Sequence, residues 1–498
     1  MDVLPSPPAF AEAHAAGKPQ VVWTEFVADV ETAVSLMLKL TGAEPMSFML
    51  ESVTGGEVRG RYSVIGWAPD LIWQCRGNRA EINRSAQADA TIFTAEPTDS
   101  LTSLRHLIEE SRIELPQGLP PMAAGLFGYL GYDMIRLVET LPTPNPDPLG
   151  LPDAVWLRPS LIAILDNVRD QVTLVTPVWH SEGAAEEAYD AAVARLETAM
   201  STLEATVARG HPAPVGGAQR SLDPVSNTSH ARYLEMVTRA KDYIRAGDIF
   251  QVVPSQRWAI PLDVTPFALY RALRRTNPSP YMFFFNLGAF HIVGASPEIL
   301  VRVRDGQVTI RPIAGTRPRG ADAEEDARLE DDLLADPKER AEHLMLLDLG
   351  RNDVGRVAKI GTVDPNEQFT VERYSHVMHI VSNVVGALRE DTDPLAALLA
   401  GMPAGTVSGA PKIRAMEIID ELEAEKRGIY AGGLGYFSAG GDMDTCIALR
   451  TGVVKDSTLY VQAGGGVVYD SDPEAEFQET VNKSKALLHA ARIARNFN

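Results

Sequence analysis

Cysteine is scarce in this sequence. The 498 residues include only Cys75 and Cys446, and neither cysteine has a second ligand at metal-binding spacing. A disulfide framework is therefore excluded, and a reducing, cytoplasmic location is the simpler expectation. Histidine and cysteine at the spacing of a zinc site are also lacking, which argues against a zinc protein.

A long hydrophobic run and an N-terminal targeting signal are lacking as well. Residues 1–5 show neither a basic region nor an apolar core, so no secretion signal is expected. The most apolar window, residues 281–295, is interrupted by Asn286, Gly288 and His291 and is too short to span a membrane. We predict two buried strands there and no membrane partner.

Positive charge is in deficit. The chain has 46 Lys and Arg against 66 Asp and Glu, a net charge of −20. A nucleic-acid or anionic-membrane surface needs a basic face, so neither partner is expected. A small anionic substrate is still compatible, because a local arginine or metal ion can reverse the local potential. The length favours two or three domains.

Composition divides the chain into two parts. Residues 183–209 are rich in Ala and Glu with apolar residues at helical spacing, which predicts a long helix. Residues 210–227 contain three prolines and two adjacent glycines but few large apolar residues, which is typical of a linker. We therefore predict an N-terminal domain over residues 1–209, a linker over 210–227 and a C-terminal domain over 228–498.

The C-terminal part alternates strands and turns. A helix is predicted from Tyr233 to a stop at Gly247, followed by a strand at 249–253. Strands at 299–304 and 308–313 flank Asp305-Gly306, a strong hairpin signal. Further strands are predicted at residues 433–438, 445–451 and 459–463, and a helix from residue 473. This order predicts an α+β fold with largely antiparallel sheets. It does not support a Rossmann fold, because the glycines at 464–466 lack the GxGxxG spacing.

Two helix starts carry paired carboxylates. Asp336 is a predicted N-cap before Pro337, Glu339 would complete a capping box, and Glu342 follows one turn later. The plain explanation is capping, since the helix dipole favours acidic residues in a first turn.

The C-terminal helix repeats this arrangement with Asp472, Pro473, Glu476 and Glu479. Here the plain explanation is that Glu479 pairs with Lys483 at i, i+4. Two carboxylate pairs on separate helices would also suit Mg²⁺, which takes oxygen ligands and keeps waters.

A dense series of motifs occupies the second half of the chain. The motifs lie at residues 250–255, 295–298, 312–318, 336–339, 348–353, 405–412, 463–466 and 476–483. In this order they resemble the chorismate-utilising enzymes, a family that includes anthranilate, aminodeoxychorismate, isochorismate and salicylate synthases. The resemblance runs from about residue 233 to the C-terminus. It implies a two-domain α/β sandwich built on largely antiparallel sheets, with the site in a cleft of the C-terminal region.

The resemblance implies chemical roles. Glu342 and Glu479 would hold Mg²⁺ against the ring carboxylate of chorismate, with Glu339 and Glu476 near the same ion. By the same resemblance, Glu298 is the general acid that protonates the departing ring hydroxyl.

His379 matches the histidine associated with pyruvate elimination; without the resemblance it would be read as an ordinary core histidine. Arg450 and Tyr430 match positions that bind the enolpyruvyl carboxylate. The other substrate-binding positions that the resemblance implies are Ala314, Gly315, Thr316, Thr406, Ala463, Gly464, Gly465 and Gly466.

Two positions separate the branches of the family. The water-adding synthases need a lysine base where this chain has Gln251, and glutamine cannot deprotonate water. Aminodeoxychorismate synthases often carry a nucleophilic lysine where this chain has Ala314. Both positions favour the anthranilate branch, in which ammonia adds beside the ring carboxylate and pyruvate is then lost. Gln251 is therefore included among the catalytic residues.

Two further segments resemble the tryptophan feedback site of the large subunits in that branch. A serine hydroxyl and backbone carbonyls could bind the ligand's ammonium, and the proline-tyrosine-methionine segment would supply apolar walls. The plain alternative is a buried strand beside a turn. The implied residues are Leu50, Glu51, Ser52, Asn277, Pro278, Ser279, Pro280, Tyr281 and Met282.

No glutaminase segment accompanies the motifs. A glutamine amidotransferase small subunit is therefore the expected partner, with free ammonium supporting some turnover by this chain alone. Two alternatives remain open at this stage. One is an aminodeoxychorismate synthase component that dispenses with the lysine, and the other is a catalytically dead, tryptophan-binding regulatory subunit.

Overall fold

Antiparallel strands dominate the computed structural model, which describes residues 1–54, 58–179, 183–204, 206, 223–374 and 377–497. The helices described are α1 (Pro7–Ala15), α2 (Ala33–Thr41), α3 (Ser100–Glu110), η1 (Pro121–Ala123), η2 (Tyr132–Leu137), α4 (Ala185–Leu203), α5 (His230–Ala246), α6 (Pro266–Thr276), α7 (Ala323–Ala335), α8 (Pro337–Gly355), α9 (Pro394–Gly401), η3 (Gly405–Val407), α10 (Lys412–Leu422), α11 (Pro473–Ile493) and η4 (Ala494–Phe497).

The strands carry most of the long-range pairing. They are β1 (Gln20–Val27), β2 (Ser47–Thr54), β3 (Val58–Arg76), β4 (Arg79–Asn83), β5 (Thr94–Ala95), β6 (Gly125–Leu130), β7 (Ala154–Asp166), β8 (Gln171–Val178), β9 (Val225–Ser226), β10 (Gln251–Val252), β11 (Ser255–Pro261), β12 (Tyr281–Asn286), β13 (His291–Ser296), β14 (Ile299–Arg304), β15 (Gln307–Ile310), β16 (Ile313–Pro318), β17 (Asp364–Arg373), β18 (Val377–Ala387), β19 (Gly409–Ala410), β20 (Gly433–Ser438), β21 (Met443–Ile447), β22 (Thr451–Lys455) and β23 (Thr458–Gly464).

Two long strands, β3 and β7, belong to both of two antiparallel sheets. One path of pairing runs from β1 through β8, β7, β3, β2, β12, β13, β22 and β23 to β11 and β9. A second path leaves β7 through β6, β20, β21, β14 and β15 to β18, which pairs with β16 and β17. The register of β3 shifts between Pro69 and Leu71 beside Ala68, whose φ is 48°. This bulge lets one strand serve two sheets.

The space between the sheets is filled by aromatic side chains. The ring of Phe48 on β2 lies 4.5 Å from that of Phe127 on β6 and 5.4 Å from that of Phe285 on β12, measured between centroids. All three side chains are fully buried. Burial on this scale is the main stabilising term for a sandwich, because each large side chain contributes roughly 1.5–3 kcal/mol.

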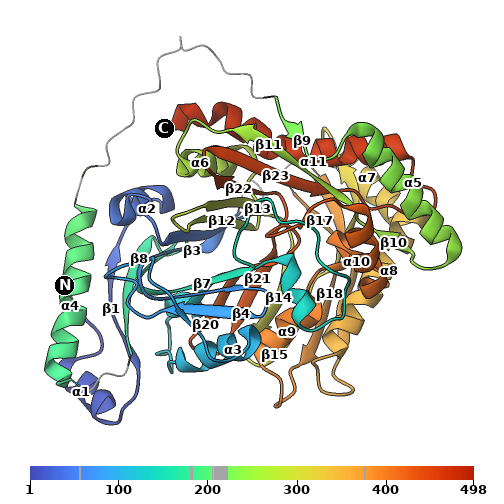
Figure 1. Ribbon diagram of the computed structural model, residues 1–498. Helices are drawn as coiled ribbons and strands as arrows, with labels where there is room; N and C mark the ends of the chain where they lie inside the picture. The colour runs from blue at the N-terminus through green and yellow to red at the C-terminus, as the bar shows by residue number, and fades with distance from the viewer. Residues whose placement is uncertain (55–57, 180–182, 205, 207–222, 375–376, 498) are drawn as a thin grey trace.

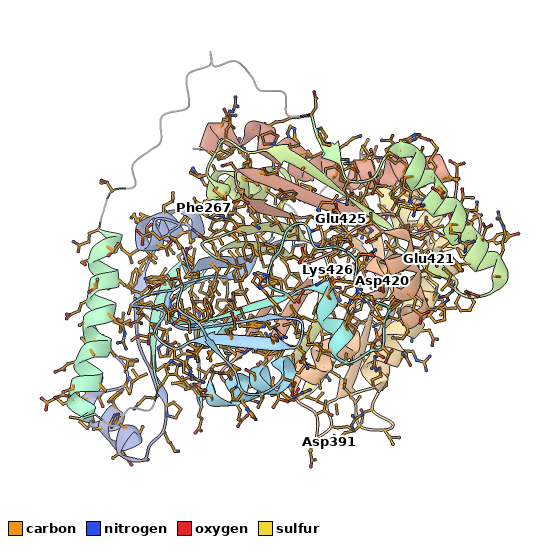
Figure 2. The ribbon with its side chains drawn as sticks, in the orientation of Figure 1. Phe267, Asp391, Asp420, Glu421, Glu425 and Lys426 are labelled. Atoms are coloured by element: carbon orange, nitrogen blue, oxygen red, sulfur yellow. The ribbon has the colours of Figure 1, made fainter. Side chains whose placement is uncertain are left out.

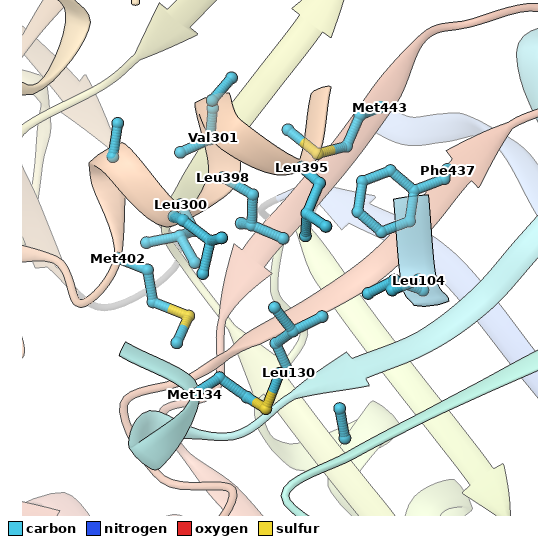
Figure 3. Packing of buried hydrophobic residues seen from close by; sticks show 14 of the residues in the cluster. Leu104, Leu130, Met134, Leu300, Val301, Leu395, Leu398, Met402, Phe437 and Met443 are labelled. Carbon is cyan, nitrogen blue, oxygen red and sulfur yellow. The ribbon is translucent and has the colours of Figure 1, made fainter. Parts of the chain in front are cut away.

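Helices cover the outer faces of the sheets. In Figure 1 α11 runs along the top of the molecule beside α6, while α5, α8 and α10 gather at the right. Figure 3 shows a second core, in which Leu104 of α3 and Leu130 of β6 lie near Leu398 of α9 and Phe437 of β20. The α+β fold with largely antiparallel pairing that the sequence predicts is confirmed.

The N-terminal and C-terminal parts of the chain share sheets as well as cores. Strand β2 pairs with β12, and β6 pairs with β20. Residues 210–222 of the predicted linker lie outside the described residues, and Val225–Ser226 form β9, which pairs with Trp258 and Ala259. The predicted division into domains at residues 209 and 228 stays a prediction.

Several local predictions are confirmed. Helix α5 ends at Gly247, whose φ is 83°, and the window at 281–295 forms β12 and β13. The Asp305-Gly306 turn joins β14 to β15 with positive φ at both residues. The predicted long helix is α4, which ends at Leu203; residues 205 and 207–209 lie outside the described residues.

Three local predictions were wrong. The single strand at 445–451 is two strands, because β21 ends at Ile447 and Arg450 turns the chain with a φ of 48° before β22. The strand at 249–253 shrinks to β10. The capping box at α8 is half formed: Asp336 accepts from the Lys338 and Glu339 N–H groups, but its own N–H donates to the Asp332 carbonyl. The Glu339 carboxylate lies instead 3.3 Å from the Arg317 guanidinium.

Candidate active site

Glu298 lies in the turn between β13 and β14 and is 8% exposed. Burial raises the pKa of its carboxyl to about 8, against the opposing effects of the Thr406 hydrogen bond and of the positive charges of Arg450 and Lys483. The Thr406 hydroxyl on η3 donates to Glu298 Oε1 at 3.0 Å. A carboxyl group with this pKa is mostly protonated at neutral pH and can act as an acid.

His379 lies on β18, with its ring nitrogen Nδ1 turned towards β16. Nδ1 is 3.0 Å from the Gly315 carbonyl oxygen and 3.0 Å from Thr316 Oγ1. A carbonyl oxygen only accepts, so Nδ1 carries the proton and Nε2 keeps its lone pair. Burial lowers the pKa of this imidazole, which keeps it neutral and able to take a proton.

The positive charge of Arg450 lowers the pKa of both Glu298 and His379. Burial lowers the pKa of Arg450 itself. The turn between β21 and β22 carries it inward, and that turn has a positive φ at Arg450 itself. Such strained backbone is typical of functional sites.

The glycines after β23 bring the main chain close to other predicted site residues. A side chain on Gly464 would lie 3.0 Å from the Tyr430 hydroxyl, and one on Gly466 would lie 2.7 Å from Gln251 Nε2. Burial raises the pKa of Tyr430 to about 12, so its hydroxyl stays protonated. Ala463 precedes this run on β23, and Lys483 of α11 donates to the Gly464 carbonyl at 3.0 Å.

The four predicted metal carboxylates lie in the first turns of α8 and α11. Burial raises the pKa of Glu342, and the neighbouring carboxylates of Glu339 and Glu479 raise it further. Burial also raises the pKa of Glu476, whose Oε2 is buried with no hydrogen-bond partner among the described residues. Glu479 pairs with Lys483 at 2.7 Å.

This set of donors fits Mg²⁺. All the groups are carboxylate oxygens, their repulsion is only partly offset by lysine, and one buried oxygen has no partner in the described chain. Within the described ranges, no three His, Cys, Asp or Glu side chains converge tightly enough to hold an ion by themselves. The coordination would therefore have to be completed by water or by a substrate carboxylate.

Gln251 lies on the two-residue strand β10, and Ala314 lies on β16. The Gln251 side chain is 3% exposed, and its Oε1 is buried without a hydrogen-bond partner in the part of the chain described. Ala314 is buried on β16, next to Gly315, where a side chain would lie 3.2 Å from Glu339 Oε2. Gly315 thus lies between His379, which its carbonyl contacts, and the Glu339 carboxylate.

The predicted tryptophan residues lie on adjacent strands and the loop before β12. Glu51 of β2 is the register partner of Met282 of β12. A cavity of about 780 Å³ is lined by six of the nine residues, Leu50, Glu51, Ser52, Pro280, Tyr281 and Met282.

The other three do not line this cavity. Asn277 caps the end of α6, and Ser279 is buried. The Glu51 carboxylate is itself held by the Arg274 guanidinium at 2.5 Å and by the Tyr270 hydroxyl, so it ties β2 to α6.

Three side chains near His379 were not predicted from the sequence. Tyr374 contacts the imidazole, with ring centroids 5.6 Å apart, and its hydroxyl donates to Glu372 at 2.9 Å. Arg311 pairs with the same carboxylate. Their positions depend on the pairing of β17 with β18, which no local sequence pattern reports.

The comparisons with known proteins identify the family of the chain. A model of the chorismate binding enzyme family matches residues 66–489. The chain belongs to that family.

Within the family the chain is a relative of anthranilate synthase component 1 proteins. It is 65% identical to the one from Cereibacter sphaeroides over 98% of this chain and 97% of the relative. It is 49% identical to the one from Pseudomonas aeruginosa, with 94% and 95% covered. The crystal structure of anthranilate synthase component I from Streptococcus pneumoniae superposes with a TM-score of 0.75 at 38% identity, covering 87% of this chain and 93% of that one.

A more distant structure supports the fold alone. The menaquinone-specific isochorismate synthase from Escherichia coli has a TM-score of 0.69 at 20% identity, with 98% of this chain and all of that chain covered. Among the helices described in this chain, none has the length and apolar character needed to cross a bilayer.

Proposed function

We propose that this chain converts chorismate and ammonia into anthranilate, pyruvate and water. The names of its relatives support the product, and Gln251 and Ala314 argue against the water-adding and lysine-dependent branches. One observation carries the mechanism. A buried carboxyl with a pKa of about 8 and a neutral imidazole with a free Nε2 lie within the electrostatic reach of one arginine, Arg450.

Departure of the ring hydroxyl is the first task. The C–O bond breaks as ammonia forms a C–N bond beside the ring carboxylate, and the leaving oxygen needs a proton. Protonated Glu298 supplies it, held towards the cleft by Thr406. General-acid help of this kind accelerates a reaction by typically 10²–10⁴-fold.

Loss of pyruvate is the second task. The ring carbon that bears the new amine gives up a proton while the bond between its neighbouring ring carbon and the enolpyruvyl oxygen breaks. The ring becomes aromatic, and the released enolpyruvate takes up a proton to become pyruvate. His379 Nε2 is the unprotonated nitrogen available for that proton, because Nδ1 donates to the Gly315 carbonyl. The tautomer of the imidazole is thus set by the Gly315 carbonyl of β16.

The two carboxylates of chorismate need separate partners. Arg450 and the Tyr430 hydroxyl suit the enolpyruvyl carboxylate, since a guanidinium matches a carboxylate in geometry and charge. Glu342 and Glu479, with Glu339 and Glu476 beside them, would hold Mg²⁺. When bound, that ion would neutralise the ring carboxylate and withdraw electrons from the ring.

Ammonia needs an acceptor rather than a base. The buried Oε1 of Gln251, which has no hydrogen-bond partner among the described residues, can accept a hydrogen bond from an ammonia N–H. This contact leaves the nitrogen lone pair free for attack. With glutamine as the source, ammonia would come from an amidotransferase small subunit, the component 2 that the relatives' names imply. We also propose L-tryptophan as the occupant and feedback inhibitor of the 780 Å³ cavity.

The decisive experiment uses the purified chain with chorismate, Mg²⁺ and ammonium. Anthranilate, identified by fluorescence and mass, is the expected product, and it should not form without ammonium. Aminodeoxychorismate or isochorismate as the product would reassign the branch. No product at all, with the chain folded, would support a regulatory subunit instead.

A further inference from the structure

A group of three side chains on one side of His379 has no part in the steps above. Arg311, Glu372 and Tyr374 form a continuous set: Arg311 Nη2 donates to Glu372 Oε1 at 2.5 Å, and the Tyr374 hydroxyl donates to Glu372 Oε2 at 2.9 Å. Both carboxylate oxygens are therefore engaged. A carboxylate whose two oxygens both accept hydrogen bonds is held in one orientation.

The sheet register brings this set to the catalytic histidine. Glu372 on β17 is the cross-strand partner of His379 on β18, and Thr316 on β16 is its partner on the other side. Directly opposed residues on antiparallel strands project from the same face, with Cβ atoms about 4.5–5.5 Å apart. His379 therefore lies in a row between a hydroxyl and a fixed carboxylate.

Tyr374 completes the enclosure. Its ring meets the imidazole at an interplanar angle of 62°, with centroids 5.6 Å apart. This edge-on arrangement is a favoured aromatic contact, and it restricts rotation of the imidazole about its side-chain bonds. The hydrogen bond to Glu372 in turn restricts the tyrosine ring.

We propose that Tyr374 and Glu372 are positioning residues that fix the plane of the His379 ring. The inference rests on the proposed function, because it assigns them to the histidine of that mechanism. On the β16 side Nδ1 is held by Gly315 and Thr316, and on the β17 side the Tyr374 ring, which Glu372 holds through its hydroxyl, blocks the alternative ring orientations. Nε2 is then left as the nitrogen that can take the proton in the proposed reaction.

The charges around the imidazole agree with this arrangement. Four groups bear on His379: the Gly315 carbonyl from β16, Glu372 and Tyr374 from β17 and the residues after it, and Arg450 from the β21–β22 turn. Burial and Arg450 lower the pKa of the imidazole, while the Gly315 carbonyl and Glu372 raise it. The charge of Glu298 acts on Tyr374 and Arg450.

The test compares three variants of the full chain. Tyr374→Leu removes the ring, Tyr374→Phe keeps the ring without its hydroxyl, and Glu372→Gln keeps the shape without the charge. Tyr243→Phe is the matched control, because the Tyr243 hydroxyl also donates to a glutamate, Glu421, with Arg239 beside it. That set joins α5 to α10, and its glutamate, Glu421, is labelled in Figure 2.

Two readouts separate positioning from a general loss of stability. The first is ammonium-dependent turnover, with kcat and KM for chorismate measured across pH. The second is the ¹⁵N signal of His379 in chain labelled at histidine, assigned by its loss in His379→Asn. This second readout does not need turnover.

For Tyr374→Leu we expect kcat to fall about 10- to 100-fold with KM for chorismate changed less than about threefold, because misplaced groups cost rate more than binding. Tyr374→Phe should restore kcat to within about threefold of the parent. Glu372→Gln should shift the His379 pKa, and the acidic limb of kcat/KM, down by roughly 0.5–1 unit. Tyr243→Phe should match the parent in every measurement.

Three results would overturn the inference. In one, Tyr374→Leu keeps the parent kcat and ¹⁵N signal. In another, KM rises in parallel with the loss of kcat in both Tyr374 variants, which would make Tyr374 a substrate contact. In the third, Glu372→Gln leaves the His379 pKa unchanged. A parent chain that makes no anthranilate would refute the proposed function, while the ¹⁵N data would still decide whether His379 is positioned.

Discussion

At the scale of single residues, one carboxyl carries a large share of the proposed chemistry. Glu298 → Gln keeps the size of the side chain and the contact with Thr406 but removes the acidic proton. We expect turnover to fall about 10²- to 10⁴-fold. Because the pKa of Glu298 is about 8 and the protonated form is the active one, parent activity should decline as pH rises through 8. A kcat profile from pH 6 to 10 tests this, and an unchanged basic limb in Glu298→Gln would contradict it.

The same residue makes a prediction about stability. The folded-state pKa of Glu298 is raised from 4.5 to about 8, so its contribution is fully present below pH 4.5 and is lost as pH rises through 8. Glu298→Gln cannot ionise, and it should therefore unfold at a higher temperature than the parent at pH 9 but at a similar temperature at pH 5. The exposed Glu474→Gln on α11 is the control. It removes only a surface carboxylate that pairs with His230, so no rise in unfolding temperature is expected at pH 9. An equal gap at both pH values would count against a buried, raised-pKa carboxyl.

The paired carboxylates make a prediction about metal dependence. Glu342→Gln and Glu479→Gln each remove a charged oxygen ligand from the proposed Mg²⁺ site, so each should abolish Mg²⁺-dependent turnover and weaken Mg²⁺ binding at least about tenfold. Calorimetric titration with Mg²⁺ measures the binding without substrate turnover. Glu474→Gln again serves as control, because Glu474 shares the first turn of α11 but pairs with His230 at the surface. If both site variants bind Mg²⁺ with the affinity of the parent, Glu342 and Glu479 are not its ligands.

At the scale of elements, the sequence predicts the helix ends and turns that depend on contacts between residues close together in the chain. Gly247 ends α5, Asp305-Gly306 turns a hairpin, and Asp472 caps α11, all through contacts within a few residues. The motif residues of the site could be named from family resemblance. Their geometry could not, because the row of Thr316, His379 and Glu372 depends on the register of three strands.

The wrong predictions share this cause. No glycine or proline between Ile447 and Thr451 marks the turn at Arg450, whose φ is positive and whose carbonyl accepts from the Ala295 N–H. Glu339 leaves the predicted capping box because Arg317, which lies 22 positions earlier, offers a charged partner. Long-range charge and packing override a local pattern in both places.

The glycine run after β23 supports a prediction of its own. A side chain on Gly466 would lie 2.7 Å from Gln251 Nε2, so Gly466→Ala should push the Gln251 amide aside. We expect KM for ammonium to rise several-fold, with KM for chorismate changed less. Gly440→Ala is the control, because its new methyl group would meet nothing closer than 3.5 Å. A rise in KM for chorismate alone would indicate that the run binds substrate rather than placing Gln251.

At the scale of the whole molecule, the two halves of the chain meet at the cavity beneath β2 and β12. Leu50 and Ser52 come from the N-terminal half, while Tyr281 and Tyr374 come from the C-terminal half, and all four line the same 780 Å³ space. Tyr374 also contacts His379. An occupant that contacts Tyr374 is therefore separated from His379 by one side chain. Through Tyr374, binding of an occupant could change the rate of the reaction, provided that the occupant binds two conformations of the site with different affinities.

Ser52→Phe tests whether tryptophan is that occupant. A phenyl ring at position 52 would fill part of the cavity, so the inhibition constant for L-tryptophan should rise at least about tenfold while uninhibited turnover stays within about twofold of the parent. Ser201→Phe, on the exposed face of α4, controls for adding a phenyl group to the surface and should leave inhibition unchanged. Ammonium-dependent turnover measured against increasing tryptophan gives both values in one experiment. If Ser52→Phe remains as sensitive as the parent, tryptophan binds elsewhere. If both sensitivity and basal turnover collapse, the cavity instead supports the fold of the active site.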